Sequence, residues 1–340
     1  MPTLLFNLGK HPDGLEMSIM PRRLHSHAKS SELTTNSHSP IRFVPASTLS
    51  ESRIIFNESL PDLNSTELLA LRRKQQRLRN SIPSTVDLAR ETSPQAVRAL
   101  KSTLIFGQAE AGTAVCIDAR GWILTCAHCF GETRQEWQTY RRKWLLYYTG
   151  LAVQVECRVW DPRRDLALAK VIHVEMEQPQ PGVANMRCPI FSYISPATMQ
   201  DPTASIFCIG QPGADDLESR LPRKTAYDLI EVSGGRLCGL IPNVDPHDNS
   251  EIGVLKHDAW TYWGHSGAPL LRSSDGTLVG LHSSWDDSTA MRHGVPLIAI
   301  RAFLEANLPA GPAGPAGPVH HPIELAGQSE SDAIVIDSSE

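Results

Sequence analysis

The stretch GTAVCIDARGWILTCAHC, residues 112–129, contains the most informative pattern in the chain. Two apolar runs are separated by residues 118–121, which have the composition of a hairpin turn. The pattern predicts two antiparallel strands that lead directly into Cys126, His128 and Cys129. Two chemistries fit this ending. Either Cys126, His128 and Cys129 begin a metal site, or His128 is a catalytic base.

Short runs of Val, Ile and Leu, separated by Gly, Pro and Asp turns, continue from about residue 97 to residue 308. This pattern of short apolar runs and turns is typical of an all-β protein. About a dozen such runs favour two closed barrels over a single sandwich. The segment IRAFLEANL, residues 300–308, predicts a C-terminal helix that closes the domain.

Composition divides the rest of the chain into two tails. Residues 1–95 are rich in Ser, Thr, Pro and charged residues, so we expect a mostly disordered region with one helix near 65–80. The folded domain is expected over residues 96–308. Residues 309–340 begin with PAGPAGPAGP and end in an acidic segment, which predicts an extended linker and a disordered tail.

The helix predicted near 65–80 is amphipathic and basic. Its apolar face is expected to contain Leu68, Leu71 and Leu78, with Ser65 as the capping residue. Its basic side chains are Arg72, Arg73, Lys74, Arg77 and Arg79. They have two interpretations, a solvated helix face or a patch for nuclear import or phosphate binding.

Charge and composition narrow the choice of partners. The formal net charge is -5 and the pI is about 6.2, which argues against a nucleic-acid-binding surface. No apolar run approaches the roughly 18 residues of a membrane span. The N-terminus does not have the pattern of a secretory signal, and the seven cysteines do not suggest a disulfide framework. We therefore expect an intracellular protein, cytoplasmic or nuclear, that binds neither nucleic acid nor membrane.

The choice between metal and catalysis depends on what the rest of the chain supplies. Three ligands within four residues are hard to arrange tetrahedrally around zinc. A catalytic base needs an acid and a nucleophile, and both occur in patterned contexts: Asp165 in RRDLALAKV and Ser266 in WGHSGAPL. Gly264 gives the backbone freedom to point its amide, with that of Ser266, at a developing oxyanion. The sequence thus favours His128, Asp165 and Ser266 as a triad, with no metal and no cofactor.

These motifs follow one another as they do in trypsin-like serine proteases, which the chain resembles. IFCIGQPG, residues 206–213, and the segment from LVGLHSSW to HGVPLIAIRAFL, residues 278–304, extend the resemblance over about residues 97–308. The motifs look closest to the HtrA and glutamyl-endopeptidase branches, without a PDZ-like segment. The resemblance implies two six-stranded antiparallel Greek-key barrels, with His128, Asp165 and Ser266 as the triad. It also implies cleavage of protein or peptide substrates.

Several residues depart from the pattern of the family. The cysteine that is bridged to the one after the catalytic histidine in secreted trypsins is missing, so Cys129 is expected to be a free thiol. His265 stands where digestive enzymes have an aspartate that receives a newly cut N-terminus. We therefore expect activity without prior cleavage. A second interpretation is a catalytically silent interaction module of the same fold, with the cleft blocked by Trp260, Trp263 or Trp285.

The specificity residues leave two alternatives open. Trp260 stands where trypsins carry an acid, which argues against basic specificity. The resemblance to glutamyl endopeptidases implies that Thr261, His282 and the adjacent Ser283 bind a substrate carboxylate. The other interpretation is a buried strand histidine, with Trp285 filling the pocket and a preference for small or apolar residues.

The C-terminal segment DAIVIDSSE, residues 332–340, places Ile334, Val335 and Ile336 beside acids and serines. It resembles a SUMO-interacting motif, which adds a strand to a sheet edge of its partner. The alternative is an acidic tail with no partner.

Overall fold

The structure is a computed structural model that describes residues 40–43, 52–56, 60–108, 111–176, 190–216, 221–286 and 288–309. The segment that contains Ile334, Val335 and Ile336 lies outside these residues, as does most of the region before residue 60. The SUMO-binding motif therefore stays a prediction.

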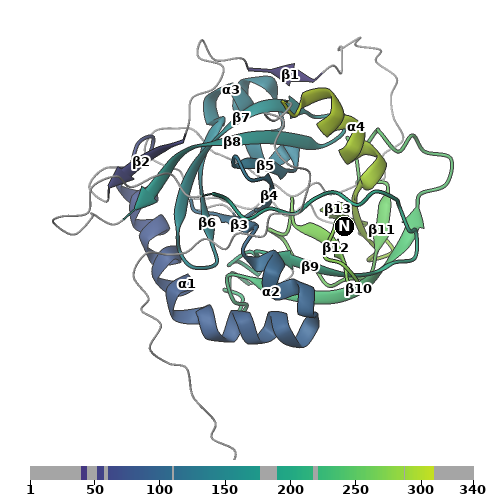
Figure 1. Cartoon of the computed structure of the whole chain (residues 1–340), viewed down its shortest axis with the longest axis horizontal. Coiled ribbons are helices and arrows are strands. Elements are labelled where there is room, and N and C mark those ends of the chain that lie inside the picture. Colours follow the sequence, from purple (N-terminus) through teal and green to yellow (C-terminus); the bar gives the residue numbers. More distant parts are fainter. Residues whose placement is uncertain are drawn as a thin grey trace, which may run out of the picture.

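The first barrel closes through six antiparallel strands in the order β3-β4-β5-β8-β7-β6. Two further strands pair with it, β1 antiparallel to β7 and β2 parallel to β8 (Figure 1). The bounds are β1 (Ile41–Arg42), β2 (Arg53–Phe56), β3 (Thr103–Phe106), β4 (Thr113–Asp118), β5 (Trp122–Thr125), β6 (Arg142–Tyr147), β7 (Ala152–Asp161) and β8 (Leu166–Met176).

The second barrel closes in the order β10-β11-β14-β13-β12-β9, again with antiparallel neighbours. Its strands are β9 (Ser205–Gly210), β10 (Glu231–Leu240), β11 (Leu255–His257), β12 (Pro269–Arg272), β13 (Leu278–Trp285) and β14 (Arg292–Pro296). The all-β fold with two six-stranded antiparallel barrels is therefore confirmed.

Two details of the second barrel differ from the expectation. The short strand β11 has only three residues and no apolar alternation, so the sequence did not reveal it. The C-terminal helix was expected over residues 300–308, but β14 ends at Pro296 and helix α4 (Leu297–Asn307) begins at once. Proline has no N–H to continue a sheet ladder, and Pro296 serves as the N-cap residue of the helix.

The remaining helices are α1 (Ser65–Thr92), α2 (Pro94–Leu100), the 3-10 helix η1 (Ala127–Phe130) and α3 (Arg134–Tyr140). In the part of the chain that the structure describes, no helix combines the length and the hydrophobicity that a membrane crossing requires.

Helix α1 is longer than the predicted helix near 65–80 and packs on the barrels. Asn64, and not Ser65, caps it, since the Asn64 side chain accepts a hydrogen bond from the N–H of Glu67 at 2.9 Å. The helix continues through Pro83, and its second half buries Thr85 and Ala89. Burial of this second half compensates for the backbone hydrogen bond that proline removes. Residues 65–92 thus form part of the folded body.

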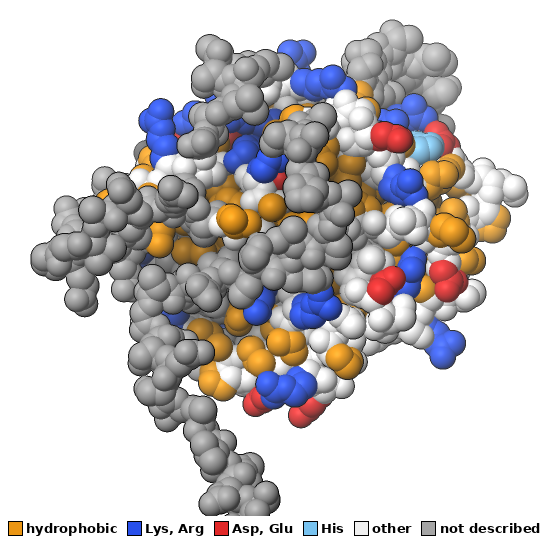
Figure 2. Space-filling view, in the orientation of Figure 1, with side chains coloured by type: hydrophobic (Ala, Val, Ile, Leu, Met, Phe, Trp, Pro, Cys, Tyr) orange, Lys and Arg blue, Asp and Glu red, His pale blue; other side chains and the backbone are white. Residues whose placement is uncertain are grey.

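The basic side of α1 is partly used by the protein itself. Arg72 forms a salt bridge with the buried Glu175, and Lys74 donates to the carbonyl oxygen of Phe106 at 2.8 Å. Arg73, Arg77 and Arg79 are exposed. On the face shown in Figure 2, described basic side chains are scattered among hydrophobic ones rather than gathered in one continuous patch. The interpretation of α1 as an independent basic helix therefore applies at most to its outer face.

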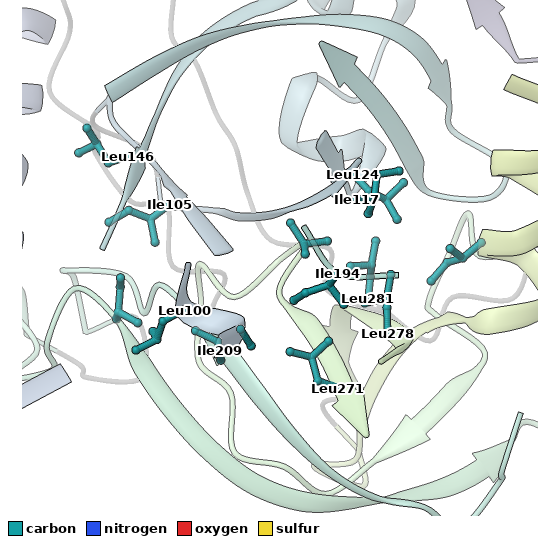
Figure 3. Packing of buried hydrophobic residues seen from close by; sticks show 14 of the residues in the cluster. Leu100, Ile105, Ile117, Leu124, Leu146, Ile194, Ile209, Leu271, Leu278 and Leu281 are labelled. Atoms are coloured by element: carbon teal, nitrogen blue, oxygen red, sulfur yellow. The ribbon is translucent and has the colours of Figure 1, made fainter. Parts of the chain in front are cut away.

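One hydrophobic cluster joins the two barrels. Ile105 and Leu124 come from the first barrel, while Ile209, Leu271 and Leu281 come from the second (Figure 3). All five are fully buried. Because this packing is continuous, it fixes the two barrels relative to each other and so positions residues that come from both of them.

Candidate active site

The base and the acid of the predicted triad lie together in the first barrel. The ring Nδ1 of His128, in η1, is 2.9 and 3.0 Å from the two carboxylate oxygens of Asp165, just before β8. The backbone N–H of His128 also donates to Asp165 Oδ1 at 3.2 Å. Asp165 is fully buried and has a positive φ of 52°, a strained conformation for an aspartate. Asp165 thus orients the imidazole, and its charge favours a proton on Nδ1.

Ser266 lies on the turn that enters β12, and the first barrel holds this turn in place. The carbonyl oxygen of Ser266 accepts from the N–H of Thr113 at 2.9 Å. The next residue, Gly267, has φ +81°, and a Cβ there would come within 2.1 Å of Thr125 Oγ1. Only glycine allows so close an approach, which explains why a glycine follows the serine.

Ser283 connects the nucleophile to the acid. Its hydroxyl donates to Asp165 Oδ2 at 2.6 Å, while its carbonyl oxygen accepts from Ser266 Oγ at 3.3 Å. Among the described residues no hydrogen bond joins Ser266 to His128. The structure therefore places the three predicted residues around one centre, with the serine hydroxyl turned toward Ser283. The Ser283 hydroxyl, which the sequence had assigned to the substrate, is engaged with Asp165.

Two backbone amides beside the serine are open. Within the described ranges, the N–H groups of Gly264 and Ser266 have no acceptor. The carbonyl oxygen of Trp263 is turned away from them, because it accepts from the N–H of Gly213 at 2.5 Å. Gly264 has φ +101°, and a Cβ there would lie 2.6 Å from Gln211 O. Two free, fixed donors are what a developing oxyanion needs.

His265 lies beneath the serine turn. Its Nδ1 is 3.1 Å from the carbonyl oxygen of Tyr262 and 3.2 Å from the N–H of the same residue. Its ring packs closely against Gly210, where an added Cβ would lie 2.4 Å from Cδ2 of His265. Burial lowers the pKa of His265 to about 3, so the ring is neutral at neutral pH. A neutral ring here holds the turn through packing and hydrogen bonds alone.

The predicted specificity residues are buried next to this turn. Thr261 and His282 are 4% and 5% exposed. The backbone of His282 pairs with the turn on both sides, because its N–H donates to Ala268 O and its carbonyl oxygen accepts from Gly267 N, each at 2.8 Å. The Nδ1 atom of His282 is 3.1 Å from Nε2 of His257. His282 is therefore a buried strand histidine placed beside the nucleophile.

His257 is a residue of this region that the sequence did not indicate. It lies on β11, is fully buried and packs its ring edge-to-face against His282. Burial lowers the pKa of His257 to about 3. A single histidine between a lysine and an aspartate, on a strand of three residues, has no pattern that singles it out.

Tryptophans flank the same region. Trp263 and Trp285 are in edge-to-face contact, with ring centroids 5.4 Å apart. Trp260 contacts His265 and Tyr227 in the same manner. Of the three tryptophans that the sequence proposed as cleft-blocking residues, Trp263 and Trp285 therefore pack against each other, while Trp260 packs against His265 and Tyr227.

The metal interpretation also has a counterpart in the structure. Cys126, His128 and Asp165 offer ligand atoms within 4.8 Å of one another, so Asp165 stands where the sequence had placed Cys129. Burial, and then the charge of Asp165, raise the pKa of the Cys126 thiol well above its ordinary value. A metal ion bound by Cys126 would have to displace that proton. If it were bound through Nδ1 of His128, it would also compete with Asp165 for this atom.

The cysteines of the described residues are free thiols, as expected for Cys129. The Cys129 thiol donates to the carbonyl oxygen of Ser266 at 3.6 Å. It therefore supports the serine turn without a disulfide.

Comparison with known proteins gives one family match. Residues 112–281, half of the chain, match the family model described as the trypsin-like peptidase domain. Among solved structures, the active form of the Rv3671c protease from M. tuberculosis is 15% identical with a TM-score of 0.45, over 68% of this chain and 89% of that chain. An inactive form of the same protease is 14% identical with a TM-score of 0.43, over 66% and 95%. No curated protein matches the sequence significantly.

Proposed function

The chain belongs to the trypsin-like peptidase family, and we propose that it is a serine endopeptidase that cuts peptide bonds through an acyl-enzyme on Ser266. One observation carries the proposal. The buried hydrogen bond between His128 and Asp165 lies beside a serine whose own amide, with that of Gly264, is an unused donor. A base, its orienting acid, a nucleophile and an oxyanion site thus occur together.

The proposed mechanism follows from the proton on Nδ1 of His128. Because Nδ1–H donates to Asp165, Nε2 has a lone pair that accepts the proton of Ser266. The hydroxyl first rotates away from Ser283 O as substrate binds. Its oxygen then attacks the carbonyl carbon, and the oxyanion is bound by the N–H groups of Gly264 and Ser266. His128 passes the proton to the leaving amine, and a water molecule hydrolyses the acyl-enzyme by the same route. No cofactor is needed.

The second candidate is a catalytically silent interaction module. Two observations favour it: Ser266 donates to Ser283 rather than to His128, and Trp263 and Trp285 pack together beside the serine turn. Catalytic hydrogen bonds are often absent before substrate binds, so the first observation is compatible with an active enzyme.

For specificity we propose a preference for acidic residues before the cleaved bond, with His282 and Thr261 as the binding residues. Their burial beside the serine turn supports this assignment. The aromatic Trp260, where a basic-specific enzyme needs an acid, supports the exclusion of lysine and arginine. The competing preference, for small or apolar residues, is supported by the position of Trp285 next to Trp263.

We also propose that the full-length chain is active without cleavage. The neutral His265 has no charge to offer a new N-terminus, and the Gly264 and Ser266 amides are already open. An intracellular location is proposed as well, supported by the free thiols of the described cysteines. Binding of SUMO through Ile334, Val335 and Ile336 is proposed from the sequence alone, and titration of a peptide of residues 320–340 against SUMO tests it, with Ile334→Ala and Ile336→Ala as controls.

A peptide library tests the proposed activity. The purified full-length chain and its Ser266→Ala variant are incubated with the library, and the products are identified by mass spectrometry. We expect cuts by the wild type alone, enriched after Glu and Asp. Equal cutting by both proteins refutes the role of Ser266. Cuts after Leu, Val or Ala only leave the triad standing and refute the acidic preference.

A further inference from the structure

His282 and His257 share a single buried hydrogen bond. Nδ1 of His282, on β13, and Nε2 of His257, on β11, are 3.1 Å apart, with the two rings perpendicular. In such a contact one ring donates its N–H and the other accepts with its lone pair. Which ring donates determines whether the second nitrogen of His282 carries a proton or a lone pair.

Both rings are neutral, which limits the arrangements to two. Burial lowers the pKa of both histidines, and the cationic or protonatable groups that act on them lower it further. These groups are Arg292, His293, His265 and His128. A neutral imidazole has only one N–H. Either His257 donates from Nε2, or His282 donates from Nδ1.

The Nδ1 atom of His257 decides between the two. It is completely enclosed and has no hydrogen-bond partner among the described residues. If His282 donated, the proton of His257 would lie on Nδ1 as a buried N–H without an acceptor. If His257 donates, Nδ1 is only a lone pair without a donor. Buried N–H groups without an acceptor are the rarer and costlier of the two. The arrangement in which His257 donates from Nε2 to Nδ1 of His282 is therefore favoured.

In the favoured arrangement the proton of His282 is on Nε2. That atom has no hydrogen-bond partner among the described residues, yet it is not one of the fully enclosed side-chain atoms. The backbone of His282 is bonded to Gly267 and Ala268, which directly follow the nucleophile. The Nε2–H group is thus a donor without a partner among the described residues, on a residue whose backbone is bonded to the serine turn.

We propose that His257 is a positioning residue that holds His282 as an Nε2–H donor, and that His282 binds the side-chain oxygen of a substrate residue. This inference rests on the proposed function and refines its substrate class. A neutral donor recognises the oxygen of a carboxylate or of a carboxamide. The substrates are therefore peptides with Glu or Gln, or their shorter homologues, before the cleaved bond, and full negative charge is not required.

The first test reads the tautomer directly and needs no activity. Full-length protein with ¹⁵N-labelled histidine is studied by NMR at neutral pH, with the His282 and His257 signals assigned from single variants. We expect a protonated Nε2 and an unprotonated Nδ1 in both rings. A proton on Nδ1 of His282 overturns the proposal, whether or not the protein is an enzyme.

The second test compares substrates in matched variants. His257→Gln keeps an N–H donor toward His282, whereas His257→Phe removes it and keeps a ring of similar size. We expect His257→Phe to lower kcat/KM for Glu and Gln peptides about tenfold, the value of one hydrogen bond, and to leave a Leu peptide unchanged. We expect His257→Gln to restore the preference. An equal loss on all three peptides, or no loss on any, contradicts the positioning role.

The wild-type enzyme supplies the final comparison. Glu and Gln peptides are expected within about tenfold of each other, because both offer the acceptor. A Gln peptide cut as poorly as a Leu peptide overturns the neutral-donor proposal in favour of a charged site. Failure of Ser266 to react with an active-site probe refutes the proposed function instead, and leaves the NMR result to decide the tautomer.

Discussion

Two buried histidines, His128 in the first barrel and His282 in the second, show how a partner decides what an imidazole does. Each is 5% exposed and each has its Nδ1 atom engaged, with Asp165 at 2.9 Å or with His257 at 3.1 Å. The carboxylate draws the proton of His128 to Nδ1, which leaves a basic Nε2 and stabilises the imidazolium. His257 donates to Nδ1 of His282, so the proton of His282 is on Nε2, and the neutral His257 supplies no negative charge. The first ring is suited to proton transfer and the second to hydrogen-bond donation.

The largest effect is expected from removal of the first histidine. His128→Ala deletes the base, and we expect kcat to fall by roughly 10⁶-fold, as in other enzymes with this triad. His282→Val serves as the matched control, since it removes the other buried imidazole. On a Leu peptide this control is expected to stay near the wild type. Steady-state kinetics with both variants checks this contrast, and similar losses would mean that the two rings do not have separate roles.

The next largest effect concerns the partner of the base. Asp165→Asn keeps the shape of the side chain but removes the charge that holds the proton of His128 on Nδ1. We expect kcat to fall by about 10⁴-fold. Ser283→Ala removes one hydrogen bond to the same carboxylate and is expected to cost about tenfold at most. If the Asn variant were no worse than the Ser283 variant, orientation of His128 by Asp165 would be excluded.

Acid should destabilise the fold through the second region. The folded pKa values of His257 and His265 are about 3, whereas an unfolded histidine titrates near 6.5, so the unfolded chain binds more protons between these values. Stability is complete above about pH 6.5 and falls as the pH drops toward 3, by up to roughly 1.4 kcal/mol per pH unit for each histidine.

Urea unfolding at pH 7 and pH 5 measures this loss. His257→Phe, which cannot be protonated, should lose less stability between the two pH values than the wild type does. An equal loss in both proteins would show that His257 does not remain neutral in the folded state.

The sequence revealed those residues and elements that have a recognisable local sequence pattern and missed those that do not. His128, Asp165 and Ser266 could be selected from the sequence because each lies at a strand end or in a glycine-bracketed turn with a strong signature. The two barrels followed from the many short apolar runs. His257 was not predictable, because β11 has three residues and its pairing with β10 and β14 is set by the closed barrel. The second half of α1 was missed since Pro83 suggests a break and its buried residues, Thr85 and Ala89, are small.

The smallest effect is expected on the substrate preference. His282→Val removes the donor, so cleavage after Glu and Gln should fall about tenfold while cleavage after Leu is unchanged. A library digest read by mass spectrometry, with wild type and variant side by side, gives both numbers at once. An unchanged preference would show that His282 is only a structural strand residue.

Covalent labelling of Ser266 tests directly whether this chain is an active serine endopeptidase. The full-length protein, its Ser266→Ala variant and its His128→Ala variant are treated with a fluorophosphonate, and the modified residue is located by mass spectrometry. We expect rapid labelling of Ser266 in the wild type without prior cleavage, none in Ser266→Ala and strongly slowed labelling in His128→Ala. A folded wild-type protein that does not react, or that reacts as slowly as the His128 variant, would contradict this expectation and identify the chain as a silent module.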